Sequence, residues 1–187
     1  DAEQVLQACN ERIEDDPSMG EKWHFAVMRG HQIVDTENWS GADIWASDLS
    51  SEGRPAVNYY YVSALASARM GRVDEAQDHL VTLTETPQSP ERDIRIKQVE
   101  SLILLENGDT EEGLRILNEA VTAESELPVD FGPPTIVKPS YELLGDVLSE
   151  LGRYDEAMDA YEKQLERTPD RRRARVEMER ISGMAFR

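Results

Sequence analysis

Apolar residues in this chain recur every three or four positions, and the stretches with this spacing come in pairs. In the clearest pair the apolar positions are Tyr141, Leu144, Val147, Leu148 and Leu151, followed by Ala157, Met158, Ala160, Tyr161 and Leu165. Such spacing predicts two amphipathic helices. Gly152 lies between them and suits the left-handed backbone that ends a helix, while Asp155 and Glu156 fall where they offset the dipole of the second helix. The pattern therefore predicts a helix, a tight turn and a second helix.

The turn between the paired helices repeats along the chain. A glycine, two further residues, an acidic pair and a small residue stand at 71–76, 108–113 and 152–157, and a weaker copy stands at 36–42. The small residues that close the four copies lie 34, 37 and 44 positions apart. Self-similarity at this period is typical of solenoids that are built from stacked hairpins.

In this register the chain resembles the tetratricopeptide repeats. The last copy carries the resemblance best, through Tyr141, Leu144, Gly145, Leu148, Gly152, Tyr154, Ala157, Tyr161 and Pro169. The resemblance implies an all-α, right-handed solenoid of helix-turn-helix hairpins. It also implies a scaffold that binds other proteins and is not an enzyme.

The repeat register divides the chain into seven parts. They are the second helix of a truncated repeat at 1–17, an irregular repeat at 18–53, repeats at 54–89 and 90–127, a proline-rich loop at 128–139, a repeat at 140–169 and a terminal helix at 170–187. Residues 1–17 align without a gap to 153–169, so the sequence opens on the second helix of a hairpin. We expect a fragment of a longer solenoid, and a processed N-terminus at Asp1 is the alternative.

The proline-rich loop sets the last repeat apart from the others. Its four prolines exclude a helix, so the loop is expected to be extended. Together with its flanks it resembles a block in a group of uncharacterised bacterial tetratricopeptide-repeat proteins. This resemblance implies a bacterial origin. The compartment stays open, since a single cysteine fits either the cytoplasm or the periplasm, with a slight preference for the periplasm.

Composition narrows the classes of function. The chain of 187 residues has 20 basic and 38 acidic side chains, which gives a formal net charge of −18. Such acidity argues against a general affinity for nucleic acid or for anionic lipid. No run approaches the ~18 apolar residues of a membrane-spanning helix, so we expect no direct membrane insertion. The single cysteine, Cys9, cannot form an internal disulfide.

Residues that often carry chemistry have structural explanations here. His24 and His31 lie seven positions apart on a predicted helix, whereas paired helical metal ligands prefer a spacing of about four. Cys9 aligns with the packed position of Tyr161, and no neighbouring feature would activate its thiol. The acidic pairs mark the starts of helices. We therefore expect no catalytic residue, no metal and no cofactor.

The concave surface of a hairpin solenoid is lined by the first helix of each repeat. The candidate groove residues are those expected to face it, namely Asn58, Tyr61, Leu65, Arg69, Arg95, Gln98, Leu102, Glu142, Asp146 and Glu150. The tryptophans Trp23, Trp39 and Trp45 are interpreted as core packing, with an aromatic peptide groove as the alternative.

The last predicted helix is rich in arginine. Arg171, Arg172 and Arg175 form either a docking surface for an acidic partner or a solvated helix end. The leading hypothesis for function is a non-catalytic scaffold that holds a segment of a partner protein or peptide in the concave groove. The alternative is an accessory domain or subunit of a larger bacterial enzyme or redox complex, whose active residues lie outside this chain. Self-association through exposed solenoid ends is also compatible with the sequence.

Overall fold

The computed structural model describes residues 18–44, 53–129 and 135–184, together with positions 4, 8 and 11. Within the three ranges every regular element is a helix, and none of these helices is long and apolar enough to cross a membrane. The elements are α2 (Met19–Thr36), the 3₁₀ helix η1 (Trp39–Ile44), α3 (Gly53–Arg69), α4 (Val73–Glu85), α5 (Pro90–Glu106), α6 (Thr110–Ser125), α7 (Ser140–Glu150), α8 (Tyr154–Arg167) and α9 (Arg172–Met184). The helix expected at 1–17 lies outside the described residues, apart from the three single positions.

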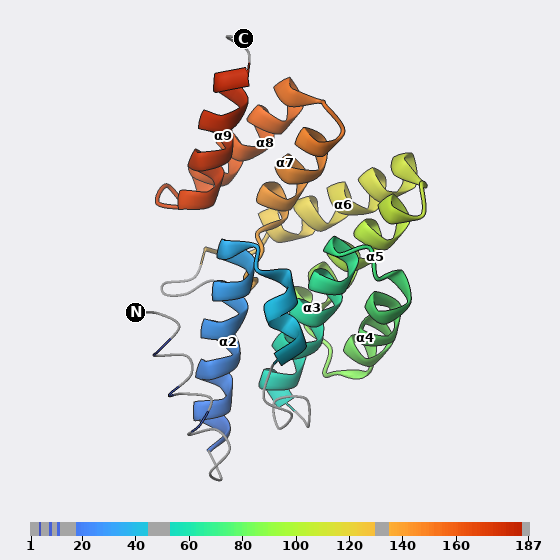
Figure 1. Ribbon diagram of the computed structural model, residues 1–187, viewed down its shortest axis with the longest axis vertical. Helices are drawn as coiled ribbons and strands as arrows, with labels where there is room; N and C mark the ends of the chain where they lie inside the picture. The colour runs from blue at the N-terminus through green and yellow to red at the C-terminus, as the bar shows by residue number, and fades with distance from the viewer. Residues whose placement is uncertain are drawn as a thin grey trace.

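Three helical hairpins, α3–α4, α5–α6 and α7–α8, follow one another along the stack (Figure 1). The first hairpin packs on the second through both of its helices, and α6 packs on α7. At the two sides of the stack, α2 lies against α3 and α9 lies against α8. The prediction of an all-α repeat fold of helical hairpins is confirmed.

The turns within the hairpins have the predicted geometry. Gly71, Gly108 and Gly152 have positive φ angles of 71°, 88° and 75°. In the first hairpin the N–H of Arg72 donates back to the Ser67 carbonyl at 2.8 Å, which satisfies a carbonyl at the end of α3. The acidic pair that follows each glycine lies in the first turn of the next helix.

The weaker copy of the turn at 36–42 folds differently from the others. Glu37 takes the left-handed conformation, with φ of 53°, and its N–H donates to the Val34 carbonyl at the end of α2. The chain then forms η1 instead of a second α-helix. Arg29 of α2 donates to the Gly41 carbonyl at 3.1 Å, which holds η1 against α2.

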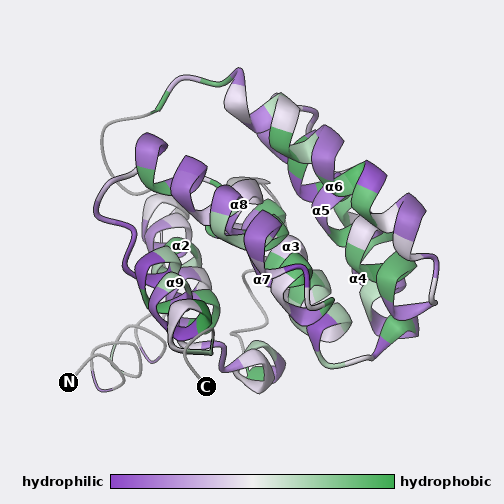
Figure 2. Cartoon of the chain, turned by 90° about the horizontal axis from the view of Figure 1, so that it is seen from above, coloured by the Kyte–Doolittle hydropathy of each residue, from purple (hydrophilic) through white to green (hydrophobic). Residues whose placement is uncertain are grey.

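Small residues let the helices approach closely where they cross. Ala76 and Ala157 are completely buried, and Gly145 of α7 lies directly under the ring of Tyr161 of α8. A Cβ atom at position 145 would lie only 2.6 Å from that ring. Apolar residues face the spaces between the helices, and polar residues face outward (Figure 2). The core is therefore continuous through the hairpins.

The substitution Gly145→Ala is expected to lower the free energy of unfolding by about 1–3 kcal/mol, because the added methyl group overpacks a closely packed crossing. The Tyr161 ring cannot move away easily, since its hydroxyl donates to Asp146 at 2.7 Å. Urea denaturation followed by circular dichroism measures the effect.

The matched control is Gly183→Ala in α9, where a Cβ atom would meet no other atom within 4 Å. Its stability should stay the same or rise by up to about 1 kcal/mol, because alanine favours the helix. Equal losses at both positions would show that the close crossing is not the cause.

Candidate functional site on the inner face

The helices α3, α5 and α7 are linked on one shared face, which we call the inner face, and α2 packs against the part of it that α3 contributes. On α3, Asn58 donates through Nδ2 to the Ala26 carbonyl of α2 at 2.5 Å. Tyr61 donates its hydroxyl to Gln98 Oε1, and this contact joins α3 to α5. Gln98 in turn donates through Nε2 to Ser140 Oγ of α7 at 2.7 Å. One chain of polar contacts thus runs across the first helices of all three hairpins.

Most candidate groove residues lie on this face and are buried. The buried members are Asn58, Tyr61, Leu65, Arg95, Gln98, Leu102, Glu142 and Asp146. The sequence suggested an open groove, but α2 covers the α3 part of this surface, and residues 135–138 of the same chain lie against α5 and α7. At its edge Arg69 donates to Glu150 at 2.5 and 3.0 Å, and the Glu150 side chain stays 56% exposed. Whether these residues bind a partner stays a prediction.

Residues 135–138, which we call the inner segment, lie on the inner face without helical structure. Arg95 donates to the carbonyl of Thr135, and Gln98 Nε2 donates to the carbonyl of Lys138 at 2.9 Å. Between these anchors Ile136 and Val137 are buried. Side chains of α5 therefore hold the backbone of the inner segment, while its apolar side chains contribute to the core.

The ammonium group of Lys138 lies between two carboxylates of α7. Its Nζ donates to Glu142 Oε1 at 2.9 Å and to Asp146 Oδ2 at 2.5 Å. The Lys138 side chain is 1% exposed, and the two acidic side chains are 0% and 6% exposed. We call Glu142 and Asp146 the lysine site.

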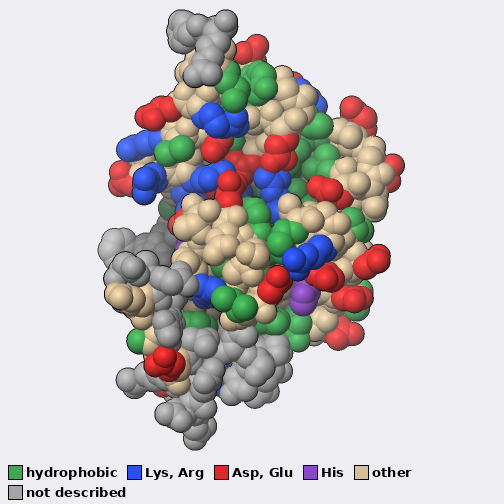
Figure 3. All heavy atoms as spheres, in the orientation of Figure 1, with side chains coloured by type: hydrophobic (Ala, Val, Ile, Leu, Met, Phe, Trp, Pro, Cys, Tyr) green, Lys and Arg blue, Asp and Glu red, His purple; other side chains and the backbone are tan. Residues whose placement is uncertain are grey.

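A second cation connects the lysine site to the neighbouring helices. Arg171, just before α9, donates to both oxygens of Glu142 at 2.7 and 2.9 Å. Its Nη2 also lies 2.8 Å from Asp35 at the end of α2. Figure 3 shows basic and acidic side chains gathered where α7 and α9 approach α2. This cluster joins the inner segment, α7, α9 and α2.

The pKa of the Glu142 carboxyl is set by competing effects. Burial raises this pKa, but Lys138 and Arg171 outweigh burial and hold it at about 2. Burial likewise lowers the pKa of Lys138, but Asp146 and Glu142 outweigh burial and raise it above its ordinary value. Glu142 and Lys138 are therefore both charged at neutral pH, and each has a partner of opposite charge inside the protein.

Two buried polar atoms on the inner face have no hydrogen-bond partner within the described part of the chain. They are Arg95 Nε, which is a donor, and Asn58 Oδ1, which is an acceptor. The Arg95 guanidinium lies 5.5 Å from the centre of the Tyr61 ring, and burial lowers its pKa. A pocket of about 390 Å³ opens beside Arg95 and Thr135, with Trp23 and Val57 in its wall. Buried polar atoms without partners are uncommon in native proteins. At this end of the site Arg95 Nε can still donate a hydrogen bond, and Asn58 Oδ1 can still accept one.

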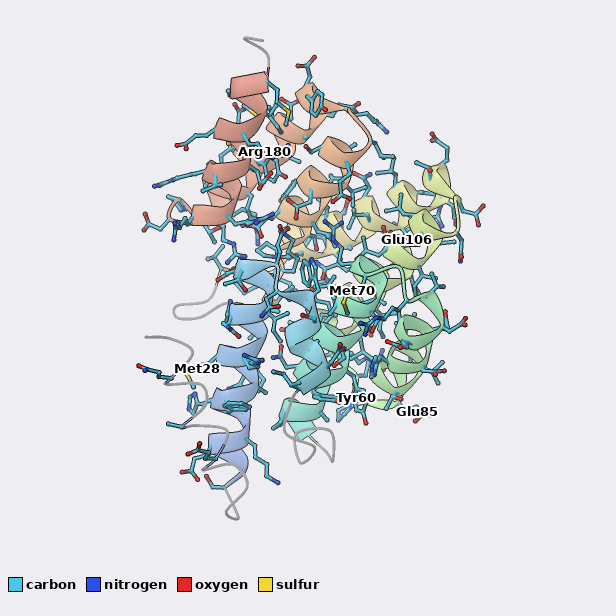
Figure 4. All side chains as sticks on the ribbon, viewed as in Figure 1. Met28, Tyr60, Met70, Glu85, Glu106 and Arg180 are labelled. Atoms are coloured by element: carbon cyan, nitrogen blue, oxygen red, sulfur yellow. The ribbon has the colours of Figure 1, made fainter. Side chains whose placement is uncertain are left out.

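The candidate arginines of the terminal helix have different environments. Arg171 is directed inward to Glu142 and Asp35, which leaves it 13% exposed. Arg172 is exposed, and Arg175 pairs with Asp170 at 3.7 Å while it stays 55% exposed. Farther along α9, Arg180 donates to Ser149 of α7 at 2.8 Å (Figure 4). Part of the basic helix therefore holds the fold together, and Arg172 and Arg175 remain available at its surface.

The other aromatic and histidine candidates lie in packed surroundings. Tyr60 packs edge-on against Tyr59, and both contact His79 of α4. Trp39 lies 6.0 Å from the Arg69 guanidinium, beside the edge of the inner face. In the described ranges no three His, Cys, Asp or Glu residues are arranged to hold a metal ion. Cys9 and Trp45 fall outside those ranges.

The roles of Lys138 and of the inner segment were not predicted from the sequence. One signal was available, because Ile136 and Val137 form an apolar pair inside a loop that is otherwise rich in proline. Such a pair favours a buried position. The partners of Lys138 carry no comparable signal, since Glu142 and Asp146 have the spacing of an ordinary helical surface.

Comparison with known proteins identifies one part of the chain. The family model of the tetratricopeptide repeat matches residues 139–171, which span α7, α8 and the approach to α9. No curated protein and no solved structure matches the chain. The matched residues include both carboxylates of the lysine site and Arg171.

The substitution Glu142→Gln is expected to lower the free energy of unfolding at pH 7 by about 1–3 kcal/mol, because Lys138 and Arg171 each lose one of two carboxylate partners and keep only Asp146 and Asp35, respectively. The folded pKa of about 2 lies below the ordinary value of 4.5, so folding favours the ionised carboxylate. This stabilisation is fully present above pH 4.5 and is lost as the pH falls toward 2. Urea denaturation between pH 2 and 7 should therefore show a weaker acid-induced loss in the variant.

The exposed Glu162 on α8 supplies the control for this measurement. Glu162→Gln should retain the pH dependence of the natural chain. An acid-induced loss in Glu142→Gln as large as in the natural chain would contradict the assigned role of Glu142.

Proposed function

Since residues 139–171 match the tetratricopeptide repeat, we propose that the chain is a tetratricopeptide-repeat protein and a non-catalytic scaffold that holds an extended segment of another protein on its inner face. Members of this family generally act in protein–protein interaction. The residues proposed to contact the partner are those of α3, α5 and α7 that lie on the inner face.

One observation carries this proposal. Two polar side chains of the inner face, Arg95 and Gln98, donate to backbone carbonyls of the non-helical inner segment, whereas Asn58 donates to a carbonyl of α2. Side-chain donors that bind backbone carbonyls accept extended peptides of many sequences. A face with this chemistry is suited to a partner segment that has no fold of its own.

The charges on the face add selectivity. Glu142 and Asp146 place two carboxylates at one buried point, where Lys138 and Arg171 now pair with them, and Glu150 is a third at the exposed edge. A partner with positive charge gains from this arrangement, and a partner with negative charge is repelled both there and by the net charge of −18. The proposed partner is therefore a protein with a basic extended segment.

Photo-crosslinking in the source cells tests the proposed surface. A photoreactive phenylalanine analogue replaces Glu150 at the edge of the inner face, Arg172 on α9, or Lys163. Lys163 lines a separate outer pocket of about 580 Å³ between α6 and α8. Replacing Glu150 removes its ion pair with Arg69 at the edge of the inner face, where the Glu150 side chain is 56% exposed. We expect this to cost about 1 kcal/mol, so the protein should stay folded.

We expect a discrete crosslinked protein from position 150 and none from position 163. A crosslink from position 172 alone would assign docking to the basic helix instead. Crosslinks from position 163 alone, or from none of the three, would contradict a scaffold that uses the inner face.

A further inference from the structure

We propose that the inner segment is an intramolecular ligand, and that the partner is an extended protein segment whose lysine replaces Lys138 between Glu142 and Asp146. This inference rests on the proposed scaffold function and adds the chemistry of the partner and a means of regulation. When the partner binds, the inner segment leaves the inner face.

The length of the connection indicates that the inner segment is not needed merely to join two hairpins. The connection from α4 to α5 uses four residues, 86–89, whereas the connection from α6 to α7 uses 14, 126–139. Short connections are the norm between packed helices. The extra length lets the chain run along the inner face before it enters α7.

The contacts of the inner segment have the composition of a peptide-binding site. Two carbonyls, those of Thr135 and Lys138, accept hydrogen bonds from α5, and these contacts do not depend on side-chain identity. Val137 is buried as an apolar anchor, and Lys138 supplies the charge. Backbone bonds, one apolar anchor and one charged anchor are the features by which extended peptides are recognised.

The lysine site selects an ammonium group for a physical reason. If Lys138 left without replacement, Asp146 would keep the hydrogen bond from the Tyr161 hydroxyl and Glu142 would keep Arg171, but both would lose the cation in direct contact with them from the inner segment. Unpaired buried charge is strongly destabilising, so the open state is rare in the free chain and becomes the stable state only when another cation replaces Lys138. Since Arg171 already occupies both oxygens of Glu142, a compact ammonium fits the remaining space better than a second planar guanidinium.

In the part of the chain that the structure describes, the inner segment leaves two polar atoms and a pocket of the inner face without a bound group. A partner segment that contacts them would bind more tightly than the inner segment does. Arg95 Nε and Asn58 Oδ1 are buried without a hydrogen-bond partner in the described ranges while the inner segment is in place. The pocket of about 390 Å³ beside Arg95 and Thr135 has room for further residues of an incoming segment. A longer peptide backbone can satisfy the free donor and still place its lysine in the site.

The first experiment measures whether the inner segment opens locally in the natural chain. The chain has four lysines, Lys22, Lys97, Lys138 and Lys163, and an amine-reactive reagent followed by peptide mass spectrometry reports each of them separately. Lys138 is buried, so it reacts only when the inner segment opens, and the exposed Lys163 serves as the internal reference.

Local opening exposes little surface, so its rate should depend only weakly on urea below the unfolding transition. We expect the labelling of Lys138 to show this weak dependence. Labelling that follows the full urea dependence of global unfolding would overturn the proposal, because the inner segment would then be a fixed part of the core.

The second experiment measures binding of a free peptide by fluorescence anisotropy. The probe is a labelled peptide with the sequence of residues 135–140, Thr-Ile-Val-Lys-Pro-Ser, added to the natural chain and to the double variant Val137→Gly/Lys138→Gly. Removing the internal competitor raises the fraction of open sites, so the variant should bind at least ~10-fold more tightly. A peptide with norleucine in place of lysine should lose this binding.

A folded double variant that does not bind the peptide, or that binds the norleucine peptide equally well, would overturn the proposal. Circular dichroism establishes whether the double variant is folded. If it is not, the labelling of Lys138 in the natural chain decides the question alone.

The two proposals fail in different ways. A crosslink at position 150 together with an inner segment that opens only on global unfolding would keep the scaffold function and reject the internal ligand. Local opening and lysine-dependent peptide binding without a crosslink at position 150 would keep the lysine site and reject the scaffold function.

Discussion

The buried contact of Lys138 with Glu142 and Asp146 is the interaction on which the arrangement of the inner face depends. A charge inside a protein needs an opposite charge nearby, because its loss of hydration is not otherwise compensated. The carboxylate of Glu142 on α7 is paired with Lys138 on one side and with Arg171 on the other. Because these charges must be paired, the inner segment and the residue just before α9 both pack against α7.

Two kinds of packing stabilise the molecule, and they act at different places. Within each hairpin, small residues such as Ala76, Gly145 and Ala157 bring two helices close, and the contacts are apolar. Across the inner face the contacts are polar and join residues far apart in the chain, as Arg69 and Glu150 do. Apolar packing thus builds the repeats, and polar contacts determine how the repeats are arranged around their common face.

The hairpins were predictable because their signals are local. A positive φ at Gly71, Gly108 and Gly152 follows from the turn pattern, and the fit of Gly145 against Tyr161 follows from the repeat register. The closure of the inner face was not predictable in the same way. With 20 basic and 38 acidic side chains, very many ion pairs are conceivable, and no local pattern singles out Lys138 with Asp146 or Arg171 with Asp35. Which of these ion pairs form is determined by the distances between side chains, and these distances are set only once the hairpins have stacked.

The ion pairs between α2 and α9 have a consequence for the evolution of the array. Arg171 contacts Asp35, and Arg173 contacts Glu37, so the helices at the two sides of the stack are joined to each other. In an open solenoid a hairpin can be gained or lost with little effect on the others, because each contacts only its neighbours. Here an added hairpin would move α9 away from α2 by the width of a helix pair and break both contacts. The number of hairpins between α2 and α9 is therefore constrained by the reach of two arginine side chains.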